Sequence, residues 1–165
     1  MIAFESAVRI ERPLEDVFAY VSDPLNFPRW NSAVQTVRRT SVGADTDVGS
    51  TFAMERNLPS GRAVNALEIV TRERPREFAI RTTSGPTPFV YRYRFSPESD
   101  ATVLELDAAV ELGGAAELLR LLVRRAVQKG VDDNLATLKT ILEQRSDRTR
   151  DREHRFARTA SSLER

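Results

Sequence analysis

Two tyrosines are the residues best suited to chemistry in this sequence. Tyr91 and Tyr93 lie two residues apart in the segment "PFVYRYRF". Side chains two residues apart on a β-strand share one face, so both hydroxyl groups can point at the same carbonyl or enol oxygen of a ligand. A phenol donates a hydrogen bond without carrying a charge. The alternative is that both rings only add buried area and their hydroxyl groups bind backbone or water.

Strand alternation places three further polar residues on the same inner face: Arg56, Asn65 and Thr82. An arginine at the mouth of a pocket attracts a carboxylate or phosphate group, but Arg56 is equally compatible with a solvated strand end. The acidic residues of these segments fall on the opposite face: Glu68, Glu77, Glu105, Asp107 and Glu111. We therefore expect no buried carboxylic acid with a raised pKa.

Several enzyme classes are excluded by composition. The chain has no cysteine, and its one histidine, His154, lies in a highly charged C-terminal segment. An imidazole metal site and a Ser-His-Asp triad both need histidine on a rigid scaffold. The segment "VGADTDVGS" lacks the lysine and following helix of a phosphate-binding loop. The sequence predicts no metal and no cofactor, and its only catalytic candidates are weak ones, Tyr91 and Tyr93.

Charge and hydropathy argue against nucleic acid and membranes as binding partners. The formal net charge of the 165 residues is +1, and residues 145 to 165 hold seven arginines and four acidic residues. The rest has no basic stripe, so nucleic acid is not an expected partner. No uncharged apolar run approaches the roughly 20 residues of a membrane span, and "MIAFESAVRI" does not resemble a secretory leader. We expect a cytoplasmic monomer or homodimer.

The apolar pattern predicts an α+β fold. Alternation indicates a strand over residues 2 to 10, followed by a helix that starts near Pro13 and a second short helical piece through "DPLNFPRW". Five more alternating segments then predict an antiparallel meander, whose outer face carries interleaved charges that include Arg72, Arg81 and Glu68. Residues 115 to 144 predict one long helix that contains Gly130, a residue that indicates a bend, close packing or room for a ligand.

The sheet is too wide for one helix to cover. A helix with its side chains is roughly 10 Å wide, whereas six or seven strands at about 4.8 Å spacing span roughly 30 Å. If the sheet curls around the helix, an apolar space tends to remain between them. Two large aromatic residues in the irregular stretch after the first helix, Phe27 and Trp30, are expected to close one end of that space.

The order of elements, with "ERPLEDVFAYVSDPLNFPRWNSAV" at residues 11 to 34, resembles the START-related superfamily that includes polyketide cyclase/dehydrase-like proteins. The positions that carry the resemblance are Pro13, Val17, Phe18, Asp23, Pro24, Pro28 and Trp30. It covers residues 2 to 144 and implies a helix-grip fold, in which a curved antiparallel sheet wraps a long C-terminal helix around an apolar pocket. Some members cyclise or aromatise polyketides, and others bind or carry lipids.

These expectations define one ligand-binding domain over residues 1 to 145 and a charged, arginine-rich tail over residues 146 to 165, either disordered or a helix extension. The leading hypothesis is binding of a hydrophobic small molecule such as a lipid, an isoprenoid or a polyketide-like compound. One alternative is a polyketide cyclase or aromatase that uses Tyr91 and Tyr93, and another is a stress-response scaffold that binds protein partners. The expected pocket lining is Trp30, Phe52, Met54, Leu67, Ile80, Tyr91, Tyr93, Leu106 and Leu122.

Overall fold

The computed structural model describes residues 1–43, 45–58, 61–111 and 120–163, and in the last range it describes the side chains of residues 122–144. Seven strands form one antiparallel sheet in the order β1-β7-β6-β5-β4-β3-β2. The strands are β1 (Ile2–Ile10), β2 (Val34–Arg39), β3 (Thr51–Leu58), β4 (Gly61–Glu73), β5 (Glu77–Ser84), β6 (Phe89–Glu98) and β7 (Ala101–Val110). The predicted α+β class and strand number are confirmed.

Short helices follow β1, as the sequence predicts. Helix α1 (Leu14–Val21) begins after Pro13 and has two acidic residues in its first turn, where the helix dipole favours negative charge. The 3-10 helix η1 (Pro24–Asn26) is capped by Asp23, whose carboxylate accepts a 3.0 Å hydrogen bond from the Leu25 N–H. Helix α2 (Phe27–Trp30) follows at once. Phe27 and Trp30 are both buried, because this irregular stretch folds onto the core.

The outer face of the sheet carries cross-strand ion pairs. Arg81 pairs with Glu68, Arg92 with Glu77, and Arg94 with both Glu105 and Asp107. Arg72 differs from the sequence prediction, because β4 has a register shift between Ile69 and Thr71. Such a bulge moves the following side chains to the other face, and the Arg72 guanidinium lies 5.6 Å from the centroid of the buried Phe18 ring.

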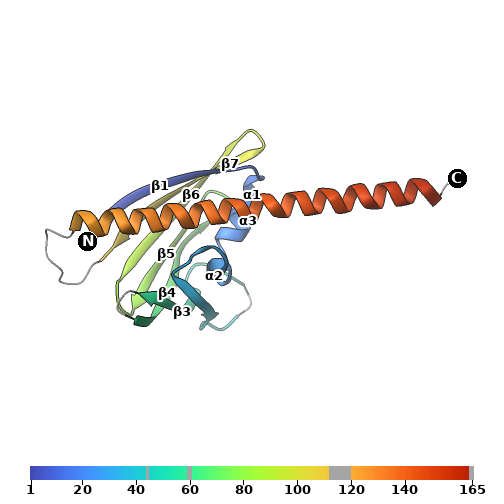
Figure 1. Cartoon of the computed structure of the whole chain (residues 1–165). Helices are drawn as coiled ribbons and strands as arrows, with labels where there is room; N and C mark the ends of the chain where they lie inside the picture. The colour runs from blue at the N-terminus through green and yellow to red at the C-terminus, as the bar shows by residue number, and fades with distance from the viewer. Residues whose placement is uncertain (44, 59–60, 112–119, 164–165) are drawn as a thin grey trace.

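Helix α3 (Arg120–Leu163) crosses the sheet and continues past it, so its C-terminal part projects from the body of the molecule (Figure 1). Its main contacts among the described residues are with β1 and α2. Val131, Leu135, Leu138 and Leu142 recur at intervals of three or four residues and form its buried face. The charged tail is therefore helical as far as Leu163, and the predicted start of the helix at residue 115 lies outside the described residues.

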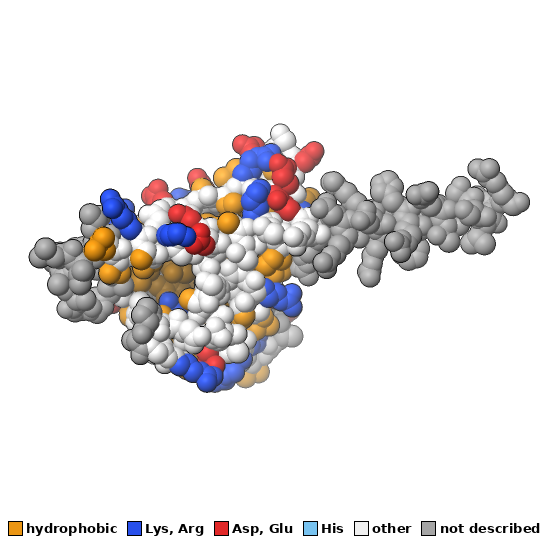
Figure 2. Space-filling model, in the orientation of Figure 1, with side chains coloured by type: hydrophobic (Ala, Val, Ile, Leu, Met, Phe, Trp, Pro, Cys, Tyr) orange, Lys and Arg blue, Asp and Glu red, His pale blue; other side chains and the backbone are white. Residues whose placement is uncertain are grey.

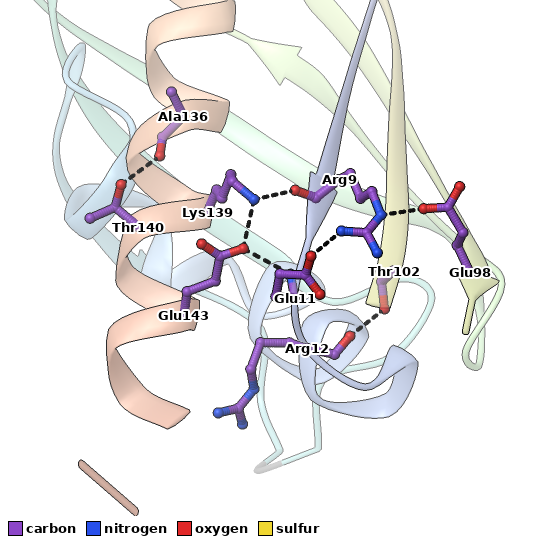
Figure 3. A network of polar contacts seen from close by, with 9 residues as sticks. All are labelled: Arg9, Glu11, Arg12, Glu98, Thr102, Ala136, Lys139, Thr140 and Glu143. Atoms are coloured by element: carbon purple, nitrogen blue, oxygen red, sulfur yellow. Dashed lines mark hydrogen bonds and ion pairs between the residues drawn. The ribbon is translucent and has the colours of Figure 1, made fainter. Parts of the chain in front are cut away.

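A polar network fixes α3 to the end of β1 (Figure 3). The Lys139 ammonium donates to the Arg9 carbonyl at 2.7 Å and to the Glu143 carboxylate at 2.6 Å. The same carboxylate accepts the Glu11 N–H at 2.8 Å. These contacts hold the middle of α3 in one position along the edge strand. Within the described ranges, no helix has the length and hydropathy that a membrane span requires.

Candidate functional site

The candidate site lies on the inner face of the sheet, beside α2. A cavity of about 20 Å³ is lined by Phe27, Asn31, Val34, Met54, Arg56, Phe89, Tyr91 and Tyr93. This enclosed volume is enough for about one water molecule. Its lining comes from α2, β2, β3 and β6, so residues far apart in the sequence meet at one point. The closed part of the site is therefore much smaller than a lipid.

Open space also lies beside α3 at Gly130. A Cβ atom built on Gly130 would have no atom within 4 Å outside the helix's own backbone. Gly130 precedes Asn134 by one turn, and residues four apart share a face of a helix. Since Asn134 contacts α2, this face of α3 turns toward the cavity. Figure 2 shows the surface hollowed beneath the N-terminal half of α3, with hydrophobic side chains in its depth.

An aromatic cluster forms the wall between the cavity and the core. The Trp30 ring meets Phe27 edge-on at 5.4 Å between centroids and Tyr93 edge-on at 6.5 Å. Tyr91 packs against Phe89 at 4.5 Å and edge-on to Tyr93 at 6.4 Å. Edge-to-face rings at these separations stabilise one another beyond the area they bury. Ring contacts from β6 therefore help to stabilise α2, which is only four residues long.

Several polar atoms on this wall lack a partner. The indole N–H of Trp30 and the Nη1 of Arg56 are buried and form no hydrogen bond. The hydroxyl groups of Tyr91 and Tyr93 also form none with the described residues. A buried donor that is left unsatisfied costs about 1–3 kcal/mol. Arg56, Tyr91 and Tyr93 line the cavity and Trp30 packs on its wall, so a ligand oxygen placed there would meet hydrogen-bond donors.

Burial sets the protonation of these groups. Burial raises the pKa of the Tyr91 hydroxyl, and the nearby Arg56 guanidinium partly opposes that shift. The pKa of Tyr93 is also raised, by burial and then by Tyr91. Burial lowers the pKa of Arg56, but a guanidinium keeps its proton in proteins. At neutral pH the site therefore contains two neutral phenols and one cation, and neither phenol is suited to act as a base.

A hydrogen-bonded cluster holds α2 against α3. The Asn134 side-chain oxygen accepts the Ser32 N–H at 3.0 Å and the Ser32 hydroxyl at 3.2 Å. The Asn134 amide nitrogen lies 3.2 Å from the side-chain oxygen of Asn31, which also accepts the Ala33 N–H at 3.1 Å. Because Asn31 lines the cavity, this cluster fixes one wall of the site. The sequence analysis missed Asn134, whose polar side chain within an apolar helix stripe was the available signal.

The structure places the expected lining residues in three groups. Met54, Tyr91 and Tyr93 line the cavity, and Trp30 contacts it through Phe27 and Tyr93. Four residues lie outside the cavity lining and are core residues as fully buried as Met54 and Tyr93: Phe52, Leu67, Ile80 and Leu106. Leu122 was expected in the lining but lies on the surface, with 61% of its area exposed. It precedes the buried Val131 by nine residues, a rotation of about 180° at about 100° per residue, so it lies on the opposite side of α3.

Hydrogen bonds show which of the other polar candidates have a structural role. The Thr82 hydroxyl accepts the Phe89 N–H at 2.9 Å, so it helps to join β5 to β6. The Asn65 side chain is buried and donates to the Pro86 carbonyl at 2.7 Å, which fixes the turn after β5. Only Arg56 joins the tyrosines at the cavity. Phe27, Val34 and Phe89 also line it, and parity alone does not distinguish them from ordinary core residues.

The family model described as "Polyketide cyclase / dehydrase and lipid transport" matches residues 1–143. The chain belongs to this family. The match covers the sheet, the short helices and the part of α3 that packs on them. A search of curated proteins found no significant relative by sequence.

Solved structures show the same fold in proteins of low sequence identity. A START superfamily protein from Mycobacterium smegmatis has a TM-score of 0.71 at 16% identity, with 86% of this chain and 97% of that chain covered. An aromatase/cyclase from a Streptomyces species has a TM-score of 0.68 at 14% identity, with coverage of 88% and 95%. A protein from Thermus thermophilus reaches 0.72 at 17% identity, with coverage of 86% and 97%. These similarities confirm the START-like fold.

Proposed function

We propose that this chain binds an apolar small molecule, such as a lipid, an isoprenoid or a polyketide-like compound, between the sheet and the N-terminal half of α3. The observation that carries the proposal is the unfilled space at Gly130, on the helix face that turns toward the aromatic wall. The family description, which includes lipid transport, supports it. Binding sites of this kind are mostly apolar, with a few placed polar groups.

Entry of a ligand requires more room than the closed cavity offers. The enclosed part measures about 20 Å³, so a ligand would occupy the open hollow and extend its end into that cavity. Val123 and Val127 lie on the same side of α3 as Gly130 and are only partly buried. A ligand would complete their burial, at about 25 cal/mol per Å² of apolar surface before the costs of association.

The lone tryptophan offers a direct test. Trp30 packs against two residues of the cavity lining, so its fluorescence reports on a ligand that reaches the wall. We expect dodecanoic acid or a comparable apolar probe to change the emission saturably. Gly130→Leu fills the open space and is expected to weaken this binding at least tenfold.

Ala136→Leu is the matched control, because it adds the same side chain at an exposed position of α3. It should bind as the wild type does. Circular dichroism establishes that both variants fold. A wild-type protein whose emission responds to no apolar probe, or a Gly130→Leu variant that binds normally, would contradict the proposal.

A second candidate function is a polyketide cyclase or aromatase. The unbonded hydroxyl groups of Tyr91 and Tyr93, on rings 6.4 Å apart, favour it, because two phenols can polarise the carbonyls of a poly-β-ketone. The test is turnover of such a chain by the wild type and by a Tyr91→Phe, Tyr93→Phe double variant. The cyclase hypothesis requires that the double variant keep apolar ligand affinity and lose turnover.

A further inference from the structure

The charge of the candidate site is not balanced by the protein. Arg56 is half-buried on β3, with its guanidinium carbon 5.5 Å from the centroid of the Phe89 ring. Among the described residues no carboxylate pairs with it, and its buried Nη1 has no hydrogen-bond partner. The neighbouring Arg62 contrasts with it, being exposed and paired with Glu55. An unpaired, partly desolvated cation is costly. Arg56 lacks the counter-charge that Arg62, Arg81 and Arg92 have on other strands.

The groups around Arg56 are also donors. The Tyr91 hydroxyl lies in the same lining and forms no hydrogen bond with the described residues. The side-chain oxygen of Asn31 is already used, since it accepts from Ala33 and from Asn134. Burial keeps both tyrosines protonated by raising their pKa values. The cavity wall thus presents one cation and neutral hydroxyl donors to whatever fills it.

We propose that the ligand is an apolar carboxylic acid whose carboxylate binds the Arg56 guanidinium and the Tyr91 hydroxyl, while its apolar part lies in the hollow along α3. This inference rests on the proposed function. A guanidinium matches a carboxylate geometrically through two parallel N–H groups. One cation also neutralises one negative charge, whereas a phosphate monoester carries more charge than Arg56 can balance in an apolar site.

The test compares dodecanoic acid with dodecanol and methyl dodecanoate, by Trp30 fluorescence at neutral pH. We expect the wild type to prefer the acid over the alcohol and the ester at least tenfold. Arg56→Met keeps the length of the side chain and removes its charge. This variant should lose the preference, because its affinity for the acid falls while its affinity for the alcohol is unchanged.

Arg62→Met is the matched control, because Arg62 lies on the adjacent strand and faces solvent. It should keep the wild-type preference. Arg56→Lys, which retains the charge, should restore part of it, and Arg56→Gln replaces Arg56→Met if that variant does not fold. Equal wild-type affinity for acid and alcohol, or a preference that survives in Arg56→Met, would overturn the acid as ligand and leave the proposed function standing. Binding of none of the three probes would overturn both.

Discussion

Val131, Leu135, Leu138 and Leu142 of α3 are at most 8% exposed, whereas Val123 and Val127, one to two turns earlier, are only partly buried. The two parts of one helix are thus held differently. The later part is fixed to β1 through Lys139 and Glu143 and to α2 through Asn134. The earlier part also contacts β1, because the Gln128 amide donates to the Glu5 carbonyl at 2.8 Å, but it has open space at Gly130. Two of the buried polar atoms without partners, on Trp30 and Arg56, are on the wall beside α2 and β3.

The comparison indicates a division of roles along α3. The anchored part places the helix on the sheet, and its position does not depend on a ligand. The open part leaves apolar surface incompletely buried, and it faces a wall on which the Trp30 and Arg56 donors have no partner. Natural proteins give up stability in this way at functional sites. Substitutions in the first part should therefore change the free energy of unfolding, and those in the second should change binding.

The largest effect is expected in the anchored part. Leu135 is 1% exposed, so Leu135→Ala leaves a cavity and should lower the free energy of unfolding by about 2–5 kcal/mol. Leu122→Ala, on the exposed side of the same helix, should lower it by less than about 0.5 kcal/mol. Urea unfolding followed by circular dichroism measures both. Similar losses for the two variants would show that the anchored and open parts do not differ.

A smaller loss is expected from Asn134→Ala. Removing this side chain takes away the acceptor of the part-buried Ser32 N–H and Ser32 hydroxyl, and each such hydrogen bond contributes about 0.5–1.5 kcal/mol. The same unfolding experiment serves, with Thr137→Ala as the control, because the exposed Thr137 hydroxyl bonds only within the helix. Since Asn134 also holds a wall of the cavity, its loss should weaken apolar ligand binding. If Asn134→Ala is as stable as the control, Asn134 does not help to hold α3 in place.

Gly130→Ala should act in the opposite direction. Alanine in a helix interior is more stable than glycine by about 1 kcal/mol, and the added Cβ meets nothing within 4 Å. We expect a higher free energy of unfolding by about that amount. Ligand affinity should change little, because a methyl group fills only part of the hollow. A destabilised Gly130→Ala variant would mean that the space beside Gly130 is already filled.

The smallest effect concerns the network at Glu143. Burial alone would raise the pKa of Glu143, but hydrogen bonds from Lys139 and the Glu11 N–H lower it overall. A lowered folded-state pKa stabilises the protein above the unfolded value of about 4.3. This contribution is lost as pH falls through the folded pKa. Because the pair is partly exposed, Glu143→Gln should cost less than about 1 kcal/mol at pH 7, with no difference from the wild type at pH 2. A difference that persists at pH 2 would contradict the ionic cause.

The fold was largely predictable from the sequence, because its signals are local and periodic. Alternation along "TVLELDAAVEL" fixes one buried face of β7, and the stripe from Val131 to Leu142 fixes that of α3. The bulge after Ile69 was not predictable, since a one-residue register shift leaves no mark in the alternation around it. It moves Arg72 from the expected outer face to the Phe18 ring.

The candidate site was predicted only in part. Parity placed Met54, Tyr91 and Tyr93 on the correct face. Parity does not tell which positions along a strand face the cavity and which face the core, so Phe52 and Leu67 were expected in the lining but lie outside it, in the core. The error at Leu122 has a different cause. Its helix phase depends on which face of α3 meets β1, a tertiary contact that the leucine-rich start of the helix does not reveal.

The central claim is that a ligand lies between the aromatic wall and the open part of α3. The most direct measurement is a set of isotope-filtered NOEs between unlabelled dodecanoic acid and the protein labelled at its methyl groups. We expect contacts from the acyl chain to Met54, Val123 and Val127, and none to Leu122. NOEs confined to exposed methyl groups, with none to Met54 or Val127, would contradict the account.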